Sequence, residues 1–196
     1  ELSSYEALDI PVVLIIRAME GMPFDTVALD NVNGAYKATR YLIENGHKRI
    51  GIISSSIHTS ASRERIDGYI KALEEYKLPN DSNLIHVGGW SLDSGYQIVN
   101  RLLSMANPPT AIFVASNVQM LGAIKALKER GIRIPQDIAL ICFDDTLWSS
   151  FLDPPITVVR PYTETLCEQS IDLLFSRINT EYTGVPRCKV VPTELI

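Results

Sequence analysis

The sequence has no excess of positive charge and no long hydrophobic run. Lys and Arg total 18 against 23 Asp and Glu, which gives a formal net charge of −5. Binding to duplex nucleic acid needs clustered positive charge that displaces counterions, and the densest basic spot is His47-Lys48-Arg49. Apolar runs fall well short of the roughly 18 residues that a membrane helix needs. We therefore expect this chain neither to bind nucleic acid directly nor to cross a membrane.

Cysteine is also scarce. Cys142, Cys167 and Cys188 are odd in number and far apart, without the spacing of a metal site. Thiols of this kind are typical of a reducing compartment, which favours a cytoplasmic protein with no metal.

Familiar catalytic signatures are missing as well. There is no GxGxxG after a strand, no GxxxxGK[ST] phosphate loop, no GxSxG elbow and no HExxH. His47, His58 and His86 stand alone, without a neighbouring nucleophile. The sequence therefore indicates a protein that is not an enzyme and carries no cofactor.

What is present is a regular alternation of strands and helices, clearest in Thr110–Asp145. Thr110–Ala115 is a short apolar run typical of a strand, and the helix that follows ends at Gly131. Ile138–Cys142 is a second buried run and closes on Asp144-Asp145. Two strands joined by a helix are parallel, so the polar residues after both strands fall on one carboxyl edge of a sheet. That edge is where open α/β sheets bind ligands.

The same reading extends along the chain and predicts an α/β fold with a parallel sheet and helices on both faces. Pro154-Pro155 interrupts the alternation, which suggests that the chain leaves the first sheet there. The predicted strands are Ile10–Ile16, Thr26–Leu29, Ile50–Ile53, Leu84–Val87, Ile156–Arg160 and Lys189–Val191, and the predicted helices are Asn33–Asn45, Ser62–Lys77, Leu92–Ala106 and Thr163–Ile178.

Four side chains at the carboxyl edge are candidates for ligand binding, and each also has a plain structural interpretation. Asp144 could accept hydrogen bonds from sugar hydroxyls, or it could simply stabilise a turn, a role to which Asp is well suited. Arg65 lies at the start of a predicted helix, where a cation is disfavoured. Either an anionic group or a ligand oxygen faces it, or the side chain is simply solvated. Trp90 could stack on a sugar or a base, or pack in the core. Ser116, with Gln119 three residues later, fits a capping box. A carboxylate, a guanidinium, an indole and a hydroxyl without a nucleophile–base pair indicate binding without turnover.

Several segments together resemble the effector-binding core of the lactose/galactose repressor (LacI/GalR) family of bacterial transcription factors. The most specific motifs are GHKRI, SRxRxxGY and IPxDIxxxxFDD, and the match covers nearly the whole chain. The matching segments are Asp30–Ile53, Ser62–Tyr69, Pro109–Ala123, Ile134–Asp145, Pro155–Val159 and Pro192–Ile196.

The resemblance implies a periplasmic-binding-protein-like fold of two Rossmann-like lobes that hold a sugar or similar metabolite between them. In that family the residues at the positions of Arg65 and Asp144 contact the effector, and the position of Trp90 is often aromatic. The family's usual Asn-Asp is Ser116-Asn117 here. A hydroxyl and a neutral amide therefore replace an amide and a carboxylate, which is expected to change the ligand preference.

The resemblance also implies a domain organisation. Residues 1–48 and 157–180 correspond to a partial N-terminal lobe, and residues 49–156 and 181–196 to the C-terminal lobe. The DNA-binding headpiece and the start of the N-terminal lobe are expected to be absent from this stretch.

The function implied is that of a cytoplasmic effector-sensing domain of a DNA-binding regulator. The partners expected are a small metabolite, a second copy of the chain, and DNA through the absent headpiece. Homodimer contacts are expected at Leu121, Ile124 and the Trp148–Leu152 loop, including Leu152, although Leu121 and Ile124 fit packing on their own sheet as well. A periplasmic sugar-binding protein of a transporter is the alternative, which the unpaired cysteines disfavour.

Overall fold

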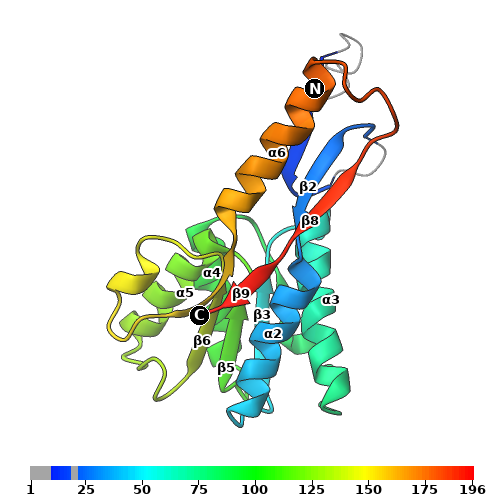
Figure 1. Cartoon of the computed structure of the whole chain (residues 1–196). Coiled ribbons are helices and arrows are strands. Elements are labelled where there is room, and N and C mark those ends of the chain that lie inside the picture. The colour runs from blue at the N-terminus through cyan, green and yellow to red at the C-terminus, as the bar shows by residue number, and fades with distance from the viewer. Residues whose placement is uncertain (1–9, 19–21) are drawn as a thin grey trace.

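The computed structural model describes residues 10–18 and 22–196, and shows a larger body with a smaller extension (Figure 1). The polar stretch 1–9 lies outside the described residues. The strands are β1 (Val13–Ile16), β2 (Asp25–Leu29), β3 (Ile50–Ser54), β4 (Ile85–Val87), β5 (Ala111–Val114), β6 (Ala139–Phe143), β7 (Thr157–Pro161), β8 (Cys188–Val191) and β9 (Thr193–Leu195). The helices are α2 (Asn31–Glu44), α3 (Ser60–Glu75), α4 (Leu92–Leu103), α5 (Asn117–Glu129) and α6 (Thr163–Ile178), with short 3₁₀ turns at Ser82–Leu84 and Ser149–Phe151.

A six-stranded sheet forms the centre of the larger body. Its strand order is β4-β3-β5-β6-β7-β9, and every pairing is parallel except that of β7 with β9. The predicted parallel sheet is thus confirmed. β9 was not predicted, because its three residues include only one apolar side chain, Leu195, and so form no apolar run.

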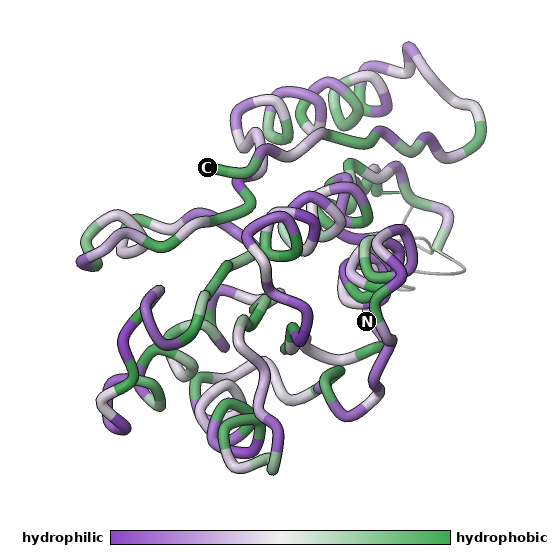
Figure 2. Tube along the Cα trace, turned by 90° about the horizontal axis from the view of Figure 1, so that it is seen from below, coloured by the Kyte–Doolittle hydropathy of each residue, from purple (hydrophilic) through white to green (hydrophobic). Residues whose placement is uncertain are grey.

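Alternate residues of the central strands build two separate cores. Ile52 and Phe113 point to the core beneath α2 and α3, whereas Ile53 and Val114 point to the core beneath α4 and α5. The helices change from hydrophobic to hydrophilic within each turn (Figure 2), as expected for helices that cover a sheet. Helices therefore lie on both faces, as the sequence predicts.

The smaller sheet has the order β1-β2-β8, all parallel, and α6 packs on it. β1 lies at its edge, and Ile15 and Ile16 are 47% and 43% exposed. The apolar run Ile10–Ile16 reads in the sequence as a buried strand. That interpretation is wrong here, because the strand lies at the sheet edge and leaves these side chains uncovered.

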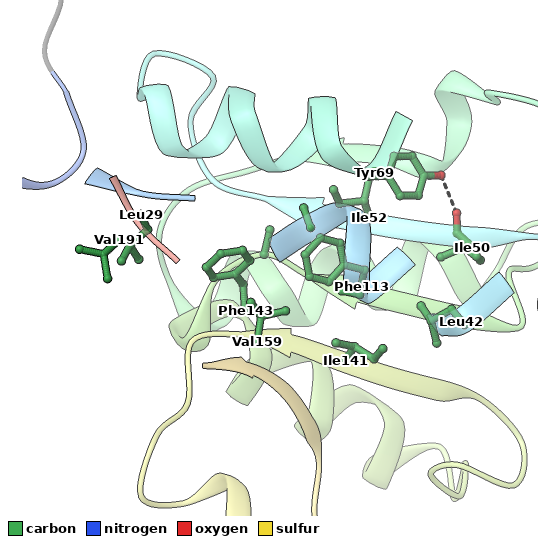
Figure 3. Packing of buried hydrophobic residues seen from close by; sticks show 14 of the residues in the cluster. Leu29, Leu42, Ile50, Ile52, Tyr69, Phe113, Ile141, Phe143, Val159 and Val191 are labelled. Carbon is green, nitrogen blue, oxygen red and sulfur yellow. Dashed lines mark hydrogen bonds between the residues drawn. The ribbon is translucent and has the colours of Figure 1, made fainter. Parts of the chain in front are cut away.

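Three chain segments join the two sheets, and the first core continues through them. Leu29 and Val191 from the smaller sheet belong to the same cluster as Phe143 and Val159 from the larger one (Figure 3). Asp25 at the start of β2 adds a polar anchor within the smaller part, since its fully buried carboxylate accepts hydrogen bonds from Arg177 at 2.8 Å and Arg187 at 2.6 Å.

The sheets divide the chain differently from the expected lobe boundaries at three places. α2, within residues 1–48, packs on α3 and the larger sheet. β7, within residues 157–180, belongs to the larger sheet, and β8, within residues 181–196, belongs to the smaller one. The chain crosses between the two sheets inside these ranges, and the assignment of residues to two lobes stays a prediction.

No helix among the described residues is long and apolar enough to span a membrane.

Candidate functional site

The carboxyl edge of the six-stranded sheet collects the predicted polar residues. Asp144 follows β6, Ser116 and Asn117 follow β5, and Trp90 follows β4, while Arg65 comes from the first half of α3. Since β3 to β7 are parallel, their carboxyl ends share one edge. The structure brings Arg65 and Asp144 together and buries Ser116 next to Ala115, whose carbonyl bonds to Arg65, whereas it leaves Trp90 exposed.

Arg65 is only 6% exposed and is held mainly by the protein itself. Its Nε donates to Asn31 Oδ1 at 2.9 Å, and Nη1 donates to the carbonyl of Ala115 at 2.8 Å. The guanidinium carbon lies 3.6 Å from the ring centroid of Phe143, a cation–π distance. Nη2 lies 3.7 Å from Asp144 Oδ1. The interpretation of Arg65 as a solvated arginine is therefore wrong.

Asp144 directs its carboxylate toward this guanidinium from an unusual backbone conformation. Its φ of +81° lies in the left-handed region, which Asp tolerates better than most residues. Its amide donates to the carbonyl of Val159 at 3.0 Å, which ties the turn to β7. Burial raises the pKa of the Asp144 carboxyl, and the charge of Arg65 lowers it in part. The side chain remains 29% exposed, so a ligand can reach it.

Arg65 and Asp144 form a loose pair rather than a closed one. Burial lowers the pKa of Arg65, and the negative charge of Asp144 opposes this effect. At 3.7 Å the two groups are within ion-pair range but beyond hydrogen-bond distance. A polar ligand atom that bonded to both would gain two charge-assisted contacts without first breaking a short salt bridge.

Ser116 stands at the N-cap of α5, but the predicted capping box was wrong. Ser116 makes no side-chain cap hydrogen bond, and its buried Oγ has no partner among the described residues. Gln119 turns away to donate to the carbonyls of Ser54 and Gly89. The Gln119 side chain is thus held through its Nε2 by two distant carbonyls, and its oxygen does not reach back to accept from the N-cap amide as a capping box requires. Asn117 begins the helix and is partly exposed.

Trp90 is 71% exposed, so the interpretation as a core residue was wrong. It follows β4 in the turn before α4, where Ser91 caps the helix by accepting a hydrogen bond from the Ser94 amide at 3.1 Å. An exposed indole next to a polar edge presents a flat apolar face to solvent.

Other residues of the site were missed by sequence reasoning. Asn31 holds Arg65 and in turn donates to Glu64 Oε2 at 2.8 Å, and Phe143 supplies the ring beneath the guanidinium. Ser54 ends β3 with a buried Oγ that has no partner in the described part of the chain. No local sequence signal marks the roles of Asn31 and Phe143. For Ser54 the only signal is a polar residue directly after an apolar strand.

The expected dimer residues have different environments. Ile124 is buried in the core beneath α4 and α5, whereas Leu121 is 40% exposed on α5. Ile124 and Leu152 line a surface groove of about 510 Å³ together with Pro154 and Ile156. Their role in an interface remains a prediction. In the ranges 10–18 and 22–196, no group of three or more His, Cys, Asp and Glu residues has the arrangement of a metal site.

The arrangement of a parallel sheet, a polar carboxyl edge and a second sheet reached by crossovers is that of an open α/β protein, a class that commonly binds ligands at this edge. Comparison with known proteins agrees. Residues 39–196 match the family described as periplasmic binding protein-like domain. The chain is 39% identical over 161 residues to the HTH-type transcriptional repressor PurR of Haemophilus influenzae, which covers 82% of this chain and 48% of that protein.

Two solved structures extend the comparison. The transcriptional regulator CelR in complex with cellobiose is 32% identical, with a TM-score of 0.90 over 98% of this chain and 59% of its own. A LacI family transcriptional regulator from Enterococcus faecium with bound ribose is 26% identical, with a TM-score of 0.88 over 99% of this chain and 72% of its own.

The chain therefore belongs to the periplasmic binding protein-like domain family, and it corresponds to the effector-binding portion of LacI/GalR-type regulators. The resemblance found in the sequence and the predicted fold class are confirmed. The chain spans about half the length of the curated relatives that it matches.

Proposed function

We propose that this chain is the effector-sensing part of a bacterial transcription regulator, and that it binds a sugar or a similar small polar metabolite at the carboxyl edge of the six-stranded sheet. The ligand-binding residues proposed are Arg65, Asp144, Trp90, Ser116 and Asn117. The chain acts by binding, without catalysis and without a cofactor.

The Arg65–Asp144 pair is the observation that carries this proposal. Both groups are held in position by the protein, through the bonds from Arg65 to Asn31 and Ala115 and through the tied turn at Asp144. The carboxylate is still 29% exposed and lies 3.7 Å from the guanidinium. A preorganised donor and acceptor side by side suit a hydroxyl group, which both donates and accepts a hydrogen bond.

The other contacts fit the same ligand class. Trp90 offers its indole face to the C–H face of a ring. Ser116 has a buried hydroxyl without a partner among the described residues, which a ligand or a water molecule would satisfy. The CelR and Enterococcus faecium structures were solved with cellobiose and ribose, which supports a saccharide as the first ligand to test.

Regulation of transcription is favoured over transport. The relatives named above are a transcriptional repressor and transcriptional regulators. The three cysteines are all free, as is usual in the reducing cytoplasm, where we place the protein. In this proposal the effector shifts the balance between two arrangements of the lobes, and a homodimer transmits the shift to DNA through a headpiece outside this chain.

Titration calorimetry of the chain against cellobiose, ribose and a panel of other sugars and nucleosides tests the proposal. With a confirmed ligand, Asp144→Asn is expected to weaken binding about tenfold or more, since a charged hydrogen-bond partner is worth about 1.5–3 kcal/mol. Asp137→Asn removes a carboxylate of the exposed pair with Arg133 and should leave binding unchanged. Equal affinity of the Asp144 variant and the parent would show that the site lies elsewhere.

A further inference from the structure

Gln119 is completely buried, although its side chain is polar. From the first turn of α5, its Nε2 donates to the carbonyl of Ser54 at 3.2 Å and to that of Gly89 at 3.1 Å. The two carbonyls fix the orientation of the amide, because a flipped amide would place its oxygen against both acceptors. The Gln119 side chain therefore reinforces the tie between the end of β3 and the turn after β4, which the Gly88 amide also makes by donating to the Ser54 carbonyl at 3.0 Å.

The turn after β4 carries Trp90. The Gly89 carbonyl accepts from Gln119 and also from the Ser91 amide at 2.9 Å. Trp90 thus lies between Gly89, which Gln119 holds, and Ser91, which caps α4. Since Trp90 is 71% exposed, packing does little to fix the ring, and the backbone of the turn sets the position from which it extends.

The helix that follows Trp90 is held against α5 at the same level. α4 and α5 pack side by side (Figure 1). A Cβ added to Gly95 would lie less than 3.0 Å from the carbonyl oxygen of Gln119, and one added to Gly122 would lie less than 3.0 Å from that of Leu92. The helix backbones are therefore in close contact, and α5 forms a platform for both the turn and the start of α4.

We propose that Gln119 is a positioning residue that sets the place of the Trp90 indole at the binding edge, and so contributes to selectivity for a ligand with a flat C–H face. The proposal rests on the proposed function in that Trp90 contacts the ligand. Gln119 acts through the Gly89 carbonyl and need not touch the ligand itself.

Time-resolved fluorescence anisotropy measures the mobility of the indole directly. In a Trp148→Phe background Trp90 is the single tryptophan of the chain. Gln119→Met removes the hydrogen bonds that Nε2 donates, including a long one to Ser94 Oγ at 3.5 Å, while keeping the volume. The amplitude of the nanosecond component is then expected to rise about twofold. Gln97→Met, on the exposed face of α4, is the matched control and should leave it unchanged. Equal amplitudes in the two variants would overturn the proposal.

Measuring the affinity for cellobiose and ribose is a second, independent test. Gln119→Met is expected to weaken binding about fivefold, the equivalent of about one hydrogen bond. In a Trp90→Ala background the same substitution should have no further effect, and a persistent fivefold loss there would contradict action through Trp90. If no sugar of the panel binds the parent chain, the sugar-binding function fails, whereas anisotropy still decides the role of Gln119.

Folding is checked by circular dichroism for each variant. Should Gln119→Met not fold, Gln119→Asn replaces it, because an amide one methylene shorter cannot span both carbonyls. The same rise in indole mobility is expected from Gln119→Asn, and its absence would equally refute the proposal.

Discussion

Replacing Arg65 by Met should destabilise the fold far more than replacing an arginine in a shorter salt bridge at the surface. Arg65→Met removes the bonds to Asn31 and Ala115, each worth about 1.5–3 kcal/mol for a charged donor, and a desolvated cation–π contact with Phe143 worth about 2 kcal/mol. Burial of the guanidinium works in the opposite direction, as the lowered pKa of Arg65 shows. Removing the charge also removes its desolvation cost of several kcal/mol, so the free energy of unfolding is expected to fall by about 3 kcal/mol in total.

Arg133→Met is the matched control. Arg133 approaches Asp137 at 2.7 Å, closer than the 3.7 Å between Arg65 and Asp144, but the Arg133 side chain is 70% exposed. An exposed pair contributes less than about 1 kcal/mol, because solvent screens the charges and the side chains lose entropy on pairing. The ion-pair distance alone therefore predicts the wrong order of the two variants.

Urea unfolding followed by circular dichroism measures both losses. With an m value of about 2–3 kcal/mol/M, a loss of about 3 kcal/mol lowers the midpoint by about 1–1.5 M. Arg133→Met should shift it by less than about 0.5 M. Similar shifts for the two variants would refute the idea that burial and the bonds to Asn31 and Ala115 make Arg65 a structural anchor.

Three further outcomes are expected. Burial alone raises the pKa of Asp25, but the hydrogen bonds from two arginines lower it well below its ordinary value. The stability that the ionised carboxylate contributes to the fold is therefore present above about pH 4 and lost as the pH falls. Asp25→Asn should accordingly make the urea midpoint less dependent on pH in the acid range. Gly122→Ala should cost at least about 2 kcal/mol of unfolding free energy, because its Cβ meets the Leu92 carbonyl, whereas Gly89→Ala, with the nearest atom 4.0 Å away, should cost little in the same urea assay. If α5 forms a dimer contact, Leu121→Glu should shift the mass in light scattering toward the monomer, and an unchanged dimer would exclude that residue.

Much of the fold was predictable from local patterns. Apolar runs separated by helical spacing predict the order of β3 to β6 and their helices, and parallel pairing then follows from chain connectivity. The polar residues after these strands, Ser116 and Asp144 among them, were expected at one edge, where the structure places them.

The contacts inside the site were not predictable in the same way. Ser116 and Gln119 fit a local capping box, yet Gln119 bonds to carbonyls 65 and 30 residues away. Arg65 finds its acceptors 34 and 50 residues away, at Asn31 and Ala115. A local pattern tells which face of an element is buried, but it does not tell which distant backbone carbonyl that face will meet.

By itself the sequence determined the α/β class, the polar carboxyl edge of the sheet and the family, because each depends on periodicity or on motifs that are continuous in the chain. The tertiary structure decided which sheet each crossing segment joins and which polar groups in the site are already bonded. These outcomes depend on chain crossings and on hydrogen bonds between distant residues, and both exist only once the two sheets and their helices have packed together.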